Sequence, residues 1–385
     1  MKIGFDAKRA YANDTGLGHY SRTLIASLAQ FYPEHAYYLF TPKEGKLFNT
    51  NSRPQLHQVL PQSWLAKKMP GMWRSNWVTK DLVKMGVDLY HGLSHEIPVG
   101  IEKTRVKTVV TMHDLIHERY PEQYALTDRL IYTQKFRYAC KHADKVIAIS
   151  EQTKTDLVEL YNTPAEKIEV CYQSCNPMYA VQLDAAGKDA IRKRYQLPEQ
   201  YMLYVGSLIE RKNLLGICKA LHSLQGSLHM PLVVIGKGGK YKTEVEQCIA
   251  ANNLQSQVIF LSYKKEILPN GYIAAEDFPG IYQMASMLIY PSIFEGFGIP
   301  VLEGLWSGVP VITSNISCLP EAGGAGAYYI NPYKPEEIAA AMQLVLENSS
   351  LRTEKIALGL QHAQTFTTDK TAAAVMKVYE GVCGV

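Results

Sequence analysis

The chain has 385 residues, and its 40 lysine and arginine residues against 36 aspartate and glutamate residues give a formal net charge of +4. This small surplus gives no indication of a nucleic-acid partner, and seven scattered cysteines, an odd number, argue against a framework of disulfide bonds. No apolar run approaches the ~20 residues that span a bilayer, and the chain begins with a strand-like segment, so no signal peptide is expected. The sequence therefore predicts a cytoplasmic protein, or one attached peripherally to the inner face of the membrane.

The first half of the chain alternates short apolar segments with helical patterns, which is typical of a parallel α/β sheet. Strands are predicted at residues 2–6, 36–41, 87–90, 106–112 and 145–149. Helices are predicted between them, for example at residues 18–31 and 130–142. Residues 1–172 are therefore predicted to form one Rossmann-like domain.

The same alternation restarts after residues 171–177, which follow neither periodicity and are interpreted as a linker. Strands are predicted near residues 201–205, 231–235, 257–261, 286–290 and 309–312. Helices are predicted at residues 212–224, 241–252, 279–284, 300–307 and 335–347. The fold class is therefore α/β, with two Rossmann-like doubly wound parallel sheets, residues 1–172 and 173–364, expected to face each other across a cleft.

The segment from Tyr290 to Glu303 contains two glutamates that flank a glycine-rich loop. The apolar residues before it are typical of the end of a buried strand, whereas Pro300 suits the first turn of a helix and Gly308 its C-terminal stop. Glu295 is therefore predicted to lie in a strand-to-helix loop, and Glu303 about one turn into the helix.

Gly296 and Gly298 lie between these two glutamates. Because they have no side chains, backbone amides can approach a ligand at the helix N-terminus, where phosphate is favoured. One carboxylate can then accept hydrogen bonds from sugar hydroxyls and the other from ribose hydroxyls, with a diphosphate between them. This layout suits a nucleotide sugar.

Two motifs of the first half also follow predicted strands, where open parallel sheets bind ligands. Gly16 and Gly18 open the first helix and can bring the backbone close to a donor phosphate or an acceptor, although they also suit a simple strand-to-helix turn. His113 directly follows the strand at 106–112, so its imidazole is expected to face the cleft. A lone histidine is more often structural, and both interpretations stay open for the residues alone.

In the second half, Gly206 and Ser207 follow the first strand, and Arg211 and Lys212 come shortly after them near a helix start. The planar fork of arginine and the compact charge of lysine together suit a phosphate that gains charge as a bond breaks. The alternative is a solvated charged turn. We interpret the pair as ligands of a diphosphate.

Taken together and in this order, these segments resemble a known family. Glu295 and Glu303 have the E-x7-E spacing of retaining glycosyltransferases of the GT-B fold, and residues 291–314 are similar to glycosyltransferase family 4, also described as group 1. The similarity continues through Gly16-Leu17-Gly18, His113-Asp114, Ala148-Ile149-Ser150, Gly206-Ser207, Arg211-Lys212-Asn213 and Leu319-Pro320-Glu321. It implies a GT-B fold, in which the last helix, here from about residue 365 to 385, often returns to the first domain.

The resemblance also implies roles for residues. The catalytic candidates are Glu295, Arg211, Lys212 and His113. Donor-binding residues are expected at Glu303, Gly296, Phe297, Gly298, Ile299, Gly206, Ser207, Gly16 and Gly18. In this family the glutamate at the position of Glu295 recognises the sugar, although a role as nucleophile is the alternative. No Asp-x-Asp motif stands at a strand end, so we expect no metal ion and no other cofactor.

The expected activity is that of a retaining, metal-independent hexosyltransferase in the synthesis of a cell-surface polysaccharide or glycan. The donor is a nucleoside-diphosphate sugar, with GDP-mannose as the first hypothesis, and the acceptor a saccharide or a lipid-linked saccharide. The alternatives are another GT-B enzyme, such as a nucleotide-sugar epimerase, and a non-catalytic module that binds sugar nucleotides. The complete E-x7-E and Arg-Lys motifs argue against both.

The segment from Trp64 to Trp77 contains three tryptophans, two methionines and several cations. Interfacial membrane-binding segments use this combination, so it predicts a peripheral membrane contact. The alternative is that Trp73 and Trp77, one helical turn apart, belong to the core of an ordinary helix, because Pro70 and Gly71 interrupt any long amphipathic helix. Binding to anionic vesicles distinguishes the two.

Overall fold

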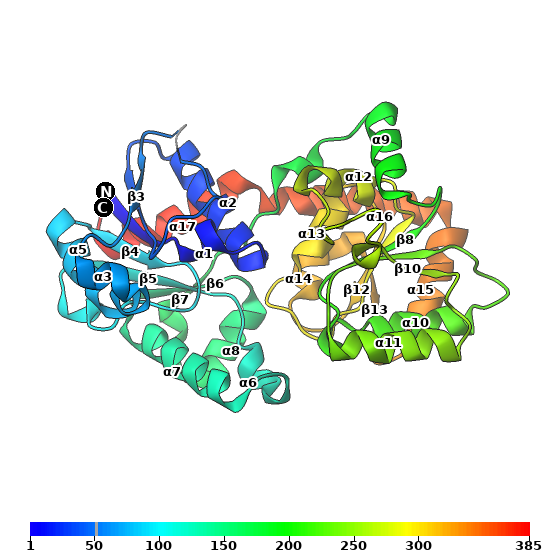
Figure 1. Ribbon diagram of the computed structural model, residues 1–385, viewed down its shortest axis with the longest axis horizontal. Coiled ribbons are helices and arrows are strands. Elements are labelled where there is room, and N and C mark those ends of the chain that lie inside the picture. Colours follow the sequence, from blue (N-terminus) through cyan, green and yellow to red (C-terminus); the bar gives the residue numbers. More distant parts are fainter. Residues whose placement is uncertain (51–52) are drawn as a thin grey trace. The chain divides into compact units, whose positions relative to one another are not determined.

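The structure is a computed structural model in which residues 1–50 and 53–385 are described. The chain divides into two compact units (Figure 1). Unit 1 comprises Met1–Ser174 and Phe366–Val385, and unit 2 comprises Cys175–Thr365. Because unit 1 contains both ends of the chain, its C-terminal helix, red in Figure 1, lies beside blue elements from the beginning of the sequence.

The described part of unit 1 contains a sheet of seven parallel strands in the order β3-β2-β1-β4-β5-β6-β7. The strands are β1 (Lys2–Asp6), β2 (Ala36–Phe40), β3 (Leu56–Val59), β4 (Leu89–Gly92), β5 (Lys107–Met112), β6 (Lys145–Ala148) and β7 (Ile168–Val170). The order reverses between β1 and β4, which creates the switch point typical of doubly wound sheets. The predicted Rossmann-like arrangement is confirmed for unit 1, although the sequence analysis missed the edge strands β3 and β7.

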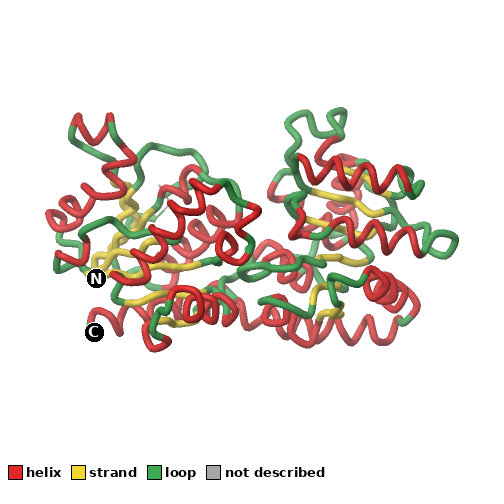
Figure 2. Tube along the Cα trace, turned by 90° about the horizontal axis from the view of Figure 1, so that it is seen from below, coloured by secondary structure: helices red, strands yellow, loops and turns green. Residues whose placement is uncertain are grey.

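Helices cover both faces of the sheet, as the red coils around the yellow strands in Figure 2 show. They are α1 (Lys8–Ala12), α2 (Gly16–Phe31), α3 (Trp64–Lys68), α4 (Pro70–Met72), α5 (Val78–Met85), α6 (Ile116–Arg119), α7 (Leu126–His142), α8 (Glu151–Tyr161) and α17 (Thr368–Cys383). Helices α5, α7 and α8 bury apolar side chains in a common core with the sheet. Helix α2 packs with α17, which also contacts β5 and β6.

A buried chain of hydrogen bonds attaches α17 to the sheet of unit 1. The hydroxyl of Tyr379 lies 2.6 Å from Nδ1 of His91, and Nε2 of His91 lies 2.8 Å from Oγ1 of Thr111. Oγ1 of Thr111 is also 3.0 Å from the hydroxyl of Tyr20 on α2. Burial, reinforced by the nearby His113, lowers the pKa of His91 to about 3, so the ring is neutral and can donate through one nitrogen and accept through the other.

Unit 2, all of whose residues are described, contains a second sheet of six parallel strands in the order β10-β9-β8-β11-β12-β13. The strands are β8 (Met202–Val205), β9 (Leu232–Ile235), β10 (Val258–Phe260), β11 (Met287–Tyr290), β12 (Val311–Ser314) and β13 (Ala327–Ile330). Its switch point lies between β8 and β11. The second Rossmann-like sheet is thus confirmed too, with only the edge strand β13 missing from the prediction.

The helices of unit 2 bring the loop residues of the candidate site into position. They are α9 (Ala185–Tyr195), α10 (Leu214–Ser223), α11 (Lys240–Ala251), α12 (Phe278–Gln283), α13 (Ile299–Trp306), α14 (Leu319–Gly323), α15 (Pro335–Glu347) and α16 (Ser349–Ala363). Helices α10, α11 and α15 share an apolar core with the sheet, while α13 contacts β11 and β12. The helix predicted at 212–224 begins only at Leu214, because Glu210–Lys212 form a 3₁₀ turn. Arg211 and Lys212 therefore lie in a tight turn before the helix.

The tryptophan-rich segment folds as short pieces, with a π-helical turn at Trp73–Trp77 between α4 and α5. Trp73 is 2% exposed, and its indole nitrogen donates a 2.6 Å hydrogen bond to Asp81, so the core interpretation is correct for this residue. Trp64 is 69% exposed, and the ammonium of Lys68 lies 4.3 Å from the centroid of its ring. Within the described residues, no helix is long and apolar enough to cross a membrane.

Candidate functional site

The candidate site of unit 2 lies at the switch point of its sheet. Strands β8 and β11 are hydrogen-bonded neighbours, and the chain leaves them toward opposite sides of the sheet. Arg211 and Lys212 follow β8, whereas Glu295 follows β11. Because the carboxyl ends of parallel strands meet at one edge, these residues, far apart in sequence, come together.

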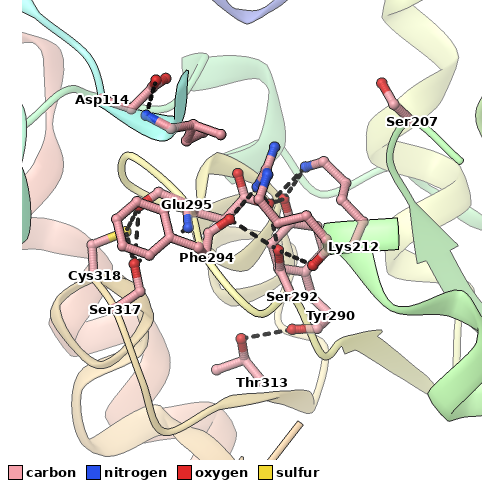
Figure 3. A network of polar contacts seen from close by, with 12 residues as sticks. Asp114, Ser207, Lys212, Tyr290, Ser292, Phe294, Glu295, Thr313, Ser317 and Cys318 are labelled. Atoms are coloured by element: carbon pink, nitrogen blue, oxygen red, sulfur yellow. Dashed lines mark hydrogen bonds and ion pairs between the residues drawn. The ribbon is translucent and has the colours of Figure 1, made fainter. Parts of the chain in front are cut away.

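Glu295 is the centre of a polar network (Figure 3). Its Oε1 lies 2.9 Å from Nη1 of Arg211 and 2.9 Å from Nζ of Lys212. The same oxygen accepts a 2.7 Å hydrogen bond from the hydroxyl of Ser292 and a 2.9 Å bond from that of Tyr290. Lys212 also donates to the hydroxyl of Tyr290. One carboxylate thus bridges both cations that the sequence assigned to a diphosphate.

The charge state of Glu295 follows from this network. Burial alone would raise its pKa, but Lys212 and Arg211, helped by the hydrogen bond from Ser292, hold the pKa at about 2. The carboxylate is therefore ionised at neutral pH. With two cations and one anion, the cluster carries a net charge of about +1, which leaves it attractive to a further anion.

The backbone around Glu295 is held in place by its neighbours. The main-chain oxygen of Glu295 accepts 3.0 Å bonds from Ser317 and from the thiol of Cys318, both in the loop after β12. On the other side, the amide of Ile293 donates a 2.8 Å bond to the carbonyl of Arg211. Three loops, after β8, β11 and β12, are thereby tied together at the same edge of the sheet.

Residues 296–299 connect Glu295 to α13 as the sequence predicted. Gly298 precedes the first residue of the helix, Ile299, and has a φ of 111°, a conformation that residues with a side chain rarely adopt. A Cβ atom there would also lie 2.8 Å from Leu319. Gly296 and Phe297 are buried, so this loop is packed into the unit rather than extended into solvent.

Glu303 lies one turn into α13, as predicted, but it does not join the network around Glu295. Its Oε2 accepts a 2.6 Å hydrogen bond from the hydroxyl of Tyr282 on α12. The side chain is partly buried, and burial raises the pKa of its carboxyl, against which the hydrogen bond from Tyr282 acts. The pKa of Glu295 is therefore lowered by the neighbouring cations, whereas the pKa of Glu303 is raised by burial.

Gly206 lies beside Lys212 of the network, whereas Ser207 lies apart from it. A Cβ atom on Gly206 would lie 2.9 Å from Cδ of Lys212, so the glycine leaves room for that lysine side chain. Ser207 is exposed, and its hydroxyl lies apart from the bonds around Glu295 in Figure 3. The backbone carbonyl of Ser207 accepts a 3.3 Å bond from Tyr204.

The glycines predicted in unit 1 differ in their surroundings. A Cβ atom on Gly18 would lie 1.9 Å from the carbonyl oxygen of Asn13, and its amide donates a 3.1 Å bond to the side chain of Asn13. Gly18 is thus required by the turn itself. A Cβ atom on Gly16 would meet nothing within 4 Å. Packing gives no reason for a glycine at residue 16, so the prediction of a ligand contact there stays open.

His113 is buried inside unit 1. Its ring lies edge-on to Tyr20 and to His95, at centroid distances of 4.6 Å and 5.1 Å, and its Nε2 is 2.9 Å from the carbonyl oxygen of Leu93. Its own carbonyl accepts a 3.2 Å bond from Thr153. Burial and the neighbouring His95 lower the pKa of His113 to about 3. The ring is therefore neutral at physiological pH and does not carry the extra proton that a general acid donates.

Several contributors to the site were missed by the sequence analysis. Tyr290 and Ser292 lie five and three residues before Glu295 and donate hydrogen bonds to its carboxylate, Tyr282 binds Glu303, and Ser317 and Cys318 hold the backbone. Tyr290 ends a buried strand and Ser292 follows it by two residues, and this position was a usable signal. For the other three no local pattern pointed to the site. Across the described residues, no group of three or more histidine, cysteine, aspartate or glutamate side chains could hold a metal ion.

Solved structures share this two-sheet architecture. Sucrose-phosphate synthase from Thermosynechococcus elongatus matches 100% of this chain and 99% of its own, with a TM-score of 0.77 and 19% identity. HepE from Anabaena, in complex with UDP and glucose, matches 99% of both chains with a TM-score of 0.72 and 17% identity. The fold is therefore that of the GT-B glycosyltransferases.

The family follows from two sequence models that together match most of the chain. The model of glycosyltransferase family 4 matches residues 15–177, and the model of glycosyl transferases group 1 matches residues 187–359. The chain therefore belongs to the glycosyltransferases that these two models describe, family 4 and group 1. A curated relative, O-antigen chain mannosyltransferase B from Escherichia coli, is 29% identical over 99% of this chain and 100% of its own length.

Proposed function

We propose that this glycosyltransferase is a retaining hexosyltransferase that transfers mannose from GDP-mannose to a saccharide or lipid-linked saccharide. The reaction belongs to the synthesis of a cell-surface polysaccharide and needs neither a metal ion nor another cofactor. The observation that carries the proposal is the meeting of Glu295, Arg211 and Lys212 at the switch point of unit 2. This is where an open parallel sheet binds its ligand.

The known relatives support mannose as the transferred sugar and a polysaccharide as the product more than they support guanine as the base of the donor. A relative named as an O-antigen chain mannosyltransferase aligns with the full chain, which favours mannose and a polysaccharide product. HepE was solved with UDP and glucose, so uracil is the main competitor of guanine. Neither the epimerase nor the non-catalytic module is favoured, because the curated relative is named as a transferase and the network is complete.

In this proposal Arg211 and Lys212 bind the diphosphate of the donor. Bond cleavage moves negative charge onto the departing diphosphate, and preorganised cations in a partly buried site stabilise that charge more in the transition state than in the ground state. Glu295 accepts hydrogen bonds from the sugar, and Glu303 accepts them from the ribose. Gly206, Ser207 and residues 296–299 surround the phosphates.

Retention of configuration follows if the acceptor attacks from the side that the diphosphate leaves. The bond from the acceptor oxygen to the anomeric carbon forms as the bond from that carbon to the phosphate oxygen breaks. The acceptor proton passes to the departing phosphate oxygen. Glu295 is a poor nucleophile for the alternative route, because two ion pairs hold its pKa at about 2. Contacts of Gly16, Gly18 and His113 with either substrate stay predictions.

A thermal-shift panel tests the donor. In buffer with EDTA, GDP and GDP-mannose at about a hundred times their Kd should raise the Tm by roughly 5–10 °C, because binding to the folded state alone adds about 2.7 kcal/mol. UDP, ADP and dTDP at the same concentration should shift it by less. A larger response to UDP would replace guanine by uracil. A response that needs Mg²⁺ or Mn²⁺ would contradict metal independence, and no response to any nucleotide would overturn the donor site.

We also propose that the enzyme works in the cytoplasm, at the inner face of the membrane, through α3. No carboxylate side chain occurs between Glu44 and Asp81, and Lys67 and Lys68 accompany the exposed Trp64. Such a surface is attracted to anionic lipids and can insert an aromatic ring into the interface.

Sedimentation with vesicles tests this surface. The protein should sediment with vesicles of phosphatidylglycerol and phosphatidylcholine, and replacing Trp64 and Leu65 by serine should lower the bound fraction about tenfold, because apolar burial drives insertion. Tyr333→Ser, an exposed aromatic of unit 2, is the matched control. The proposed contact would be contradicted if the wild type and both variants sedimented to the same extent, or if none of them sedimented with the vesicles.

A further inference from the structure

The contacts of Glu295 are concentrated on one of its two carboxylate oxygens. Within the described residues, Oε1 receives the bonds from Arg211, Lys212, Ser292 and Tyr290. Arg211 also donates to the carbonyl of Phe294. The cations that we assign to a diphosphate are therefore already paired with an internal carboxylate.

This pairing has consequences for any anion that binds there. Two cations against one carboxylate leave a charge of about +1, whereas a nucleotide-sugar diphosphate carries about −2. With Glu295 in place the filled site is negative overall; without its charge, cations and diphosphate would cancel. Like charges held close together in a partly buried site repel each other strongly. A diphosphate must therefore draw the two cations away from Glu295 or accept repulsion from it.

The sugar decides whether Glu295 gains a new partner. When the donor still carries its sugar, hydroxyl groups can donate to the carboxylate, and charge-assisted hydrogen bonds of this kind are about twice as strong as neutral ones. When the sugar has been transferred, the spent nucleoside diphosphate offers no such donors. Only the repulsion remains, and the carboxylate can return to Arg211 and Lys212.

We propose that Glu295 is an internal counterion that makes the site favour the sugar-loaded donor over the spent nucleotide. This inference rests on the proposed function, since it takes Arg211 and Lys212 as the diphosphate ligands. Before a donor binds, the carboxylate takes the place of the phosphates, and after transfer it helps to expel the product. Ser292 and Tyr290 are positioning residues that keep its Oε1 beside the cations.

The test compares the affinity of variants for GDP and for GDP-mannose by isothermal titration calorimetry. Glu295→Gln keeps the shape of the side chain and removes its charge, so GDP should bind about 5- to 10-fold more tightly than to the wild type. GDP-mannose should bind equally or more weakly, because the sugar loses its charged acceptor. The ratio of the Kd for GDP to that for GDP-mannose should therefore fall at least fivefold.

Two variants control for charge and for position. Glu210→Gln removes an exposed carboxylate next to Arg211, so both affinities should change by less than about twofold because solvent screens it. Glu303→Gln removes the other glutamate of the motif, which binds Tyr282 rather than a cation, and should weaken GDP binding.

Folding of the variants is checked separately by their Tm. If Glu295→Gln does not fold, Glu295→Asp withdraws the carboxylate from both cations while keeping its charge, and GDP should bind more tightly to it than to the wild type. GDP binding that is unchanged or weaker in a folded Glu295 variant would overturn the inference. Failure of the wild type to bind any nucleoside diphosphate would instead overturn the proposed function, so the two failures are distinguishable.

Discussion

Replacing Lys212 with alanine is expected to lower the kcat of glycosyl transfer by about 100- to 1,000-fold, the usual loss when one preorganised donor to a developing charge is removed. Its ammonium lies 2.9 Å from Glu295, and in the proposed function it binds the phosphate whose charge grows as the sugar leaves. Because this interaction strengthens in the transition state, KM for the donor should change much less than kcat. Release of nucleoside diphosphate in the presence of acceptor measures both constants.

The same substitution also changes the folded protein, and the two effects must be separated. Without Lys212, Glu295 keeps its contacts with Arg211, Ser292 and Tyr290, so the variant should fold with a lowered Tm. Lys193→Ala, which removes an exposed cation paired with Asp189 on α9, should leave kcat unchanged. A Lys212→Ala enzyme with wild-type kcat would show that this lysine does not bind the leaving group.

Most of the fold could be predicted from the sequence because a buried parallel strand has a strong local signature. Strands such as β9 and β11 are continuous apolar runs, since helices cover them on both faces. The three strands that were missed, β3, β7 and β13, lie at the edges of the sheets. Strand β3, Leu56–Val59, has two exposed residues among four, so its sequence lacks that signature.

The contacts within the candidate site were harder to predict than its members. Arg211, Lys212 and Glu295 were identified individually, but the sequence assigned the cations to phosphate and the carboxylate to sugar. That they bind one another depends on β8 being the neighbour of β11, a matter of strand order rather than of local pattern. The ion pairs, on which the proposed competition between Glu295 and a diphosphate rests, became visible only in three dimensions.

Tryptophan illustrates the same limit in a different way. Trp64 and Trp73 have similar sequence surroundings, with cations and methionines close by. One is 69% exposed and the other 2% exposed, because Pro70 begins a new helix and turns the chain between them. Which of two such residues faces solvent depends on packing against Phe40 and the rest of the core, which the local sequence does not encode.

Unit 1 contains a second buried ionic cluster, at the end of β1, whose disruption should have the largest effect on stability. Nε of Arg74 lies 3.0 Å and 3.1 Å from the two carboxylate oxygens of Asp6, and its Nη1 lies 3.0 Å from Glu96. Glu96 also accepts a 2.8 Å bond from Lys135. The side chain of Asp6 is only 3% exposed, so it depends on Arg74 for compensation of its charge.

Arg74→Leu should therefore lower the free energy of unfolding of unit 1 by about 3–5 kcal/mol, the usual cost of breaking a buried ion pair and leaving one charge without its partner. Urea denaturation followed by tryptophan fluorescence measures it, since three of the four tryptophans lie in unit 1. Lys107→Ala breaks a half-exposed pair with Asp144 at 3.5 Å and should cost less than about 1 kcal/mol. Equal losses in the two variants would contradict the special role of Arg74.

The pH dependence of the same cluster has a definite sign. Burial alone would raise the pKa of Glu96, but Arg74 and Lys135 hold it at about 2, below its ordinary value of 4.5. A carboxyl group whose pKa is lowered by folding stabilises the folded state above its unfolded pKa, and this stabilisation is lost as the pH falls from about 4.5 to about 2. Arg74 lowers the pKa of Glu96 more than Lys135 does. Removing Arg74 should therefore reduce the contribution of Glu96 to acid unfolding. A variant whose stability falls as steeply with acid as that of the wild type would show that Arg74 does not control the ionisation of Glu96.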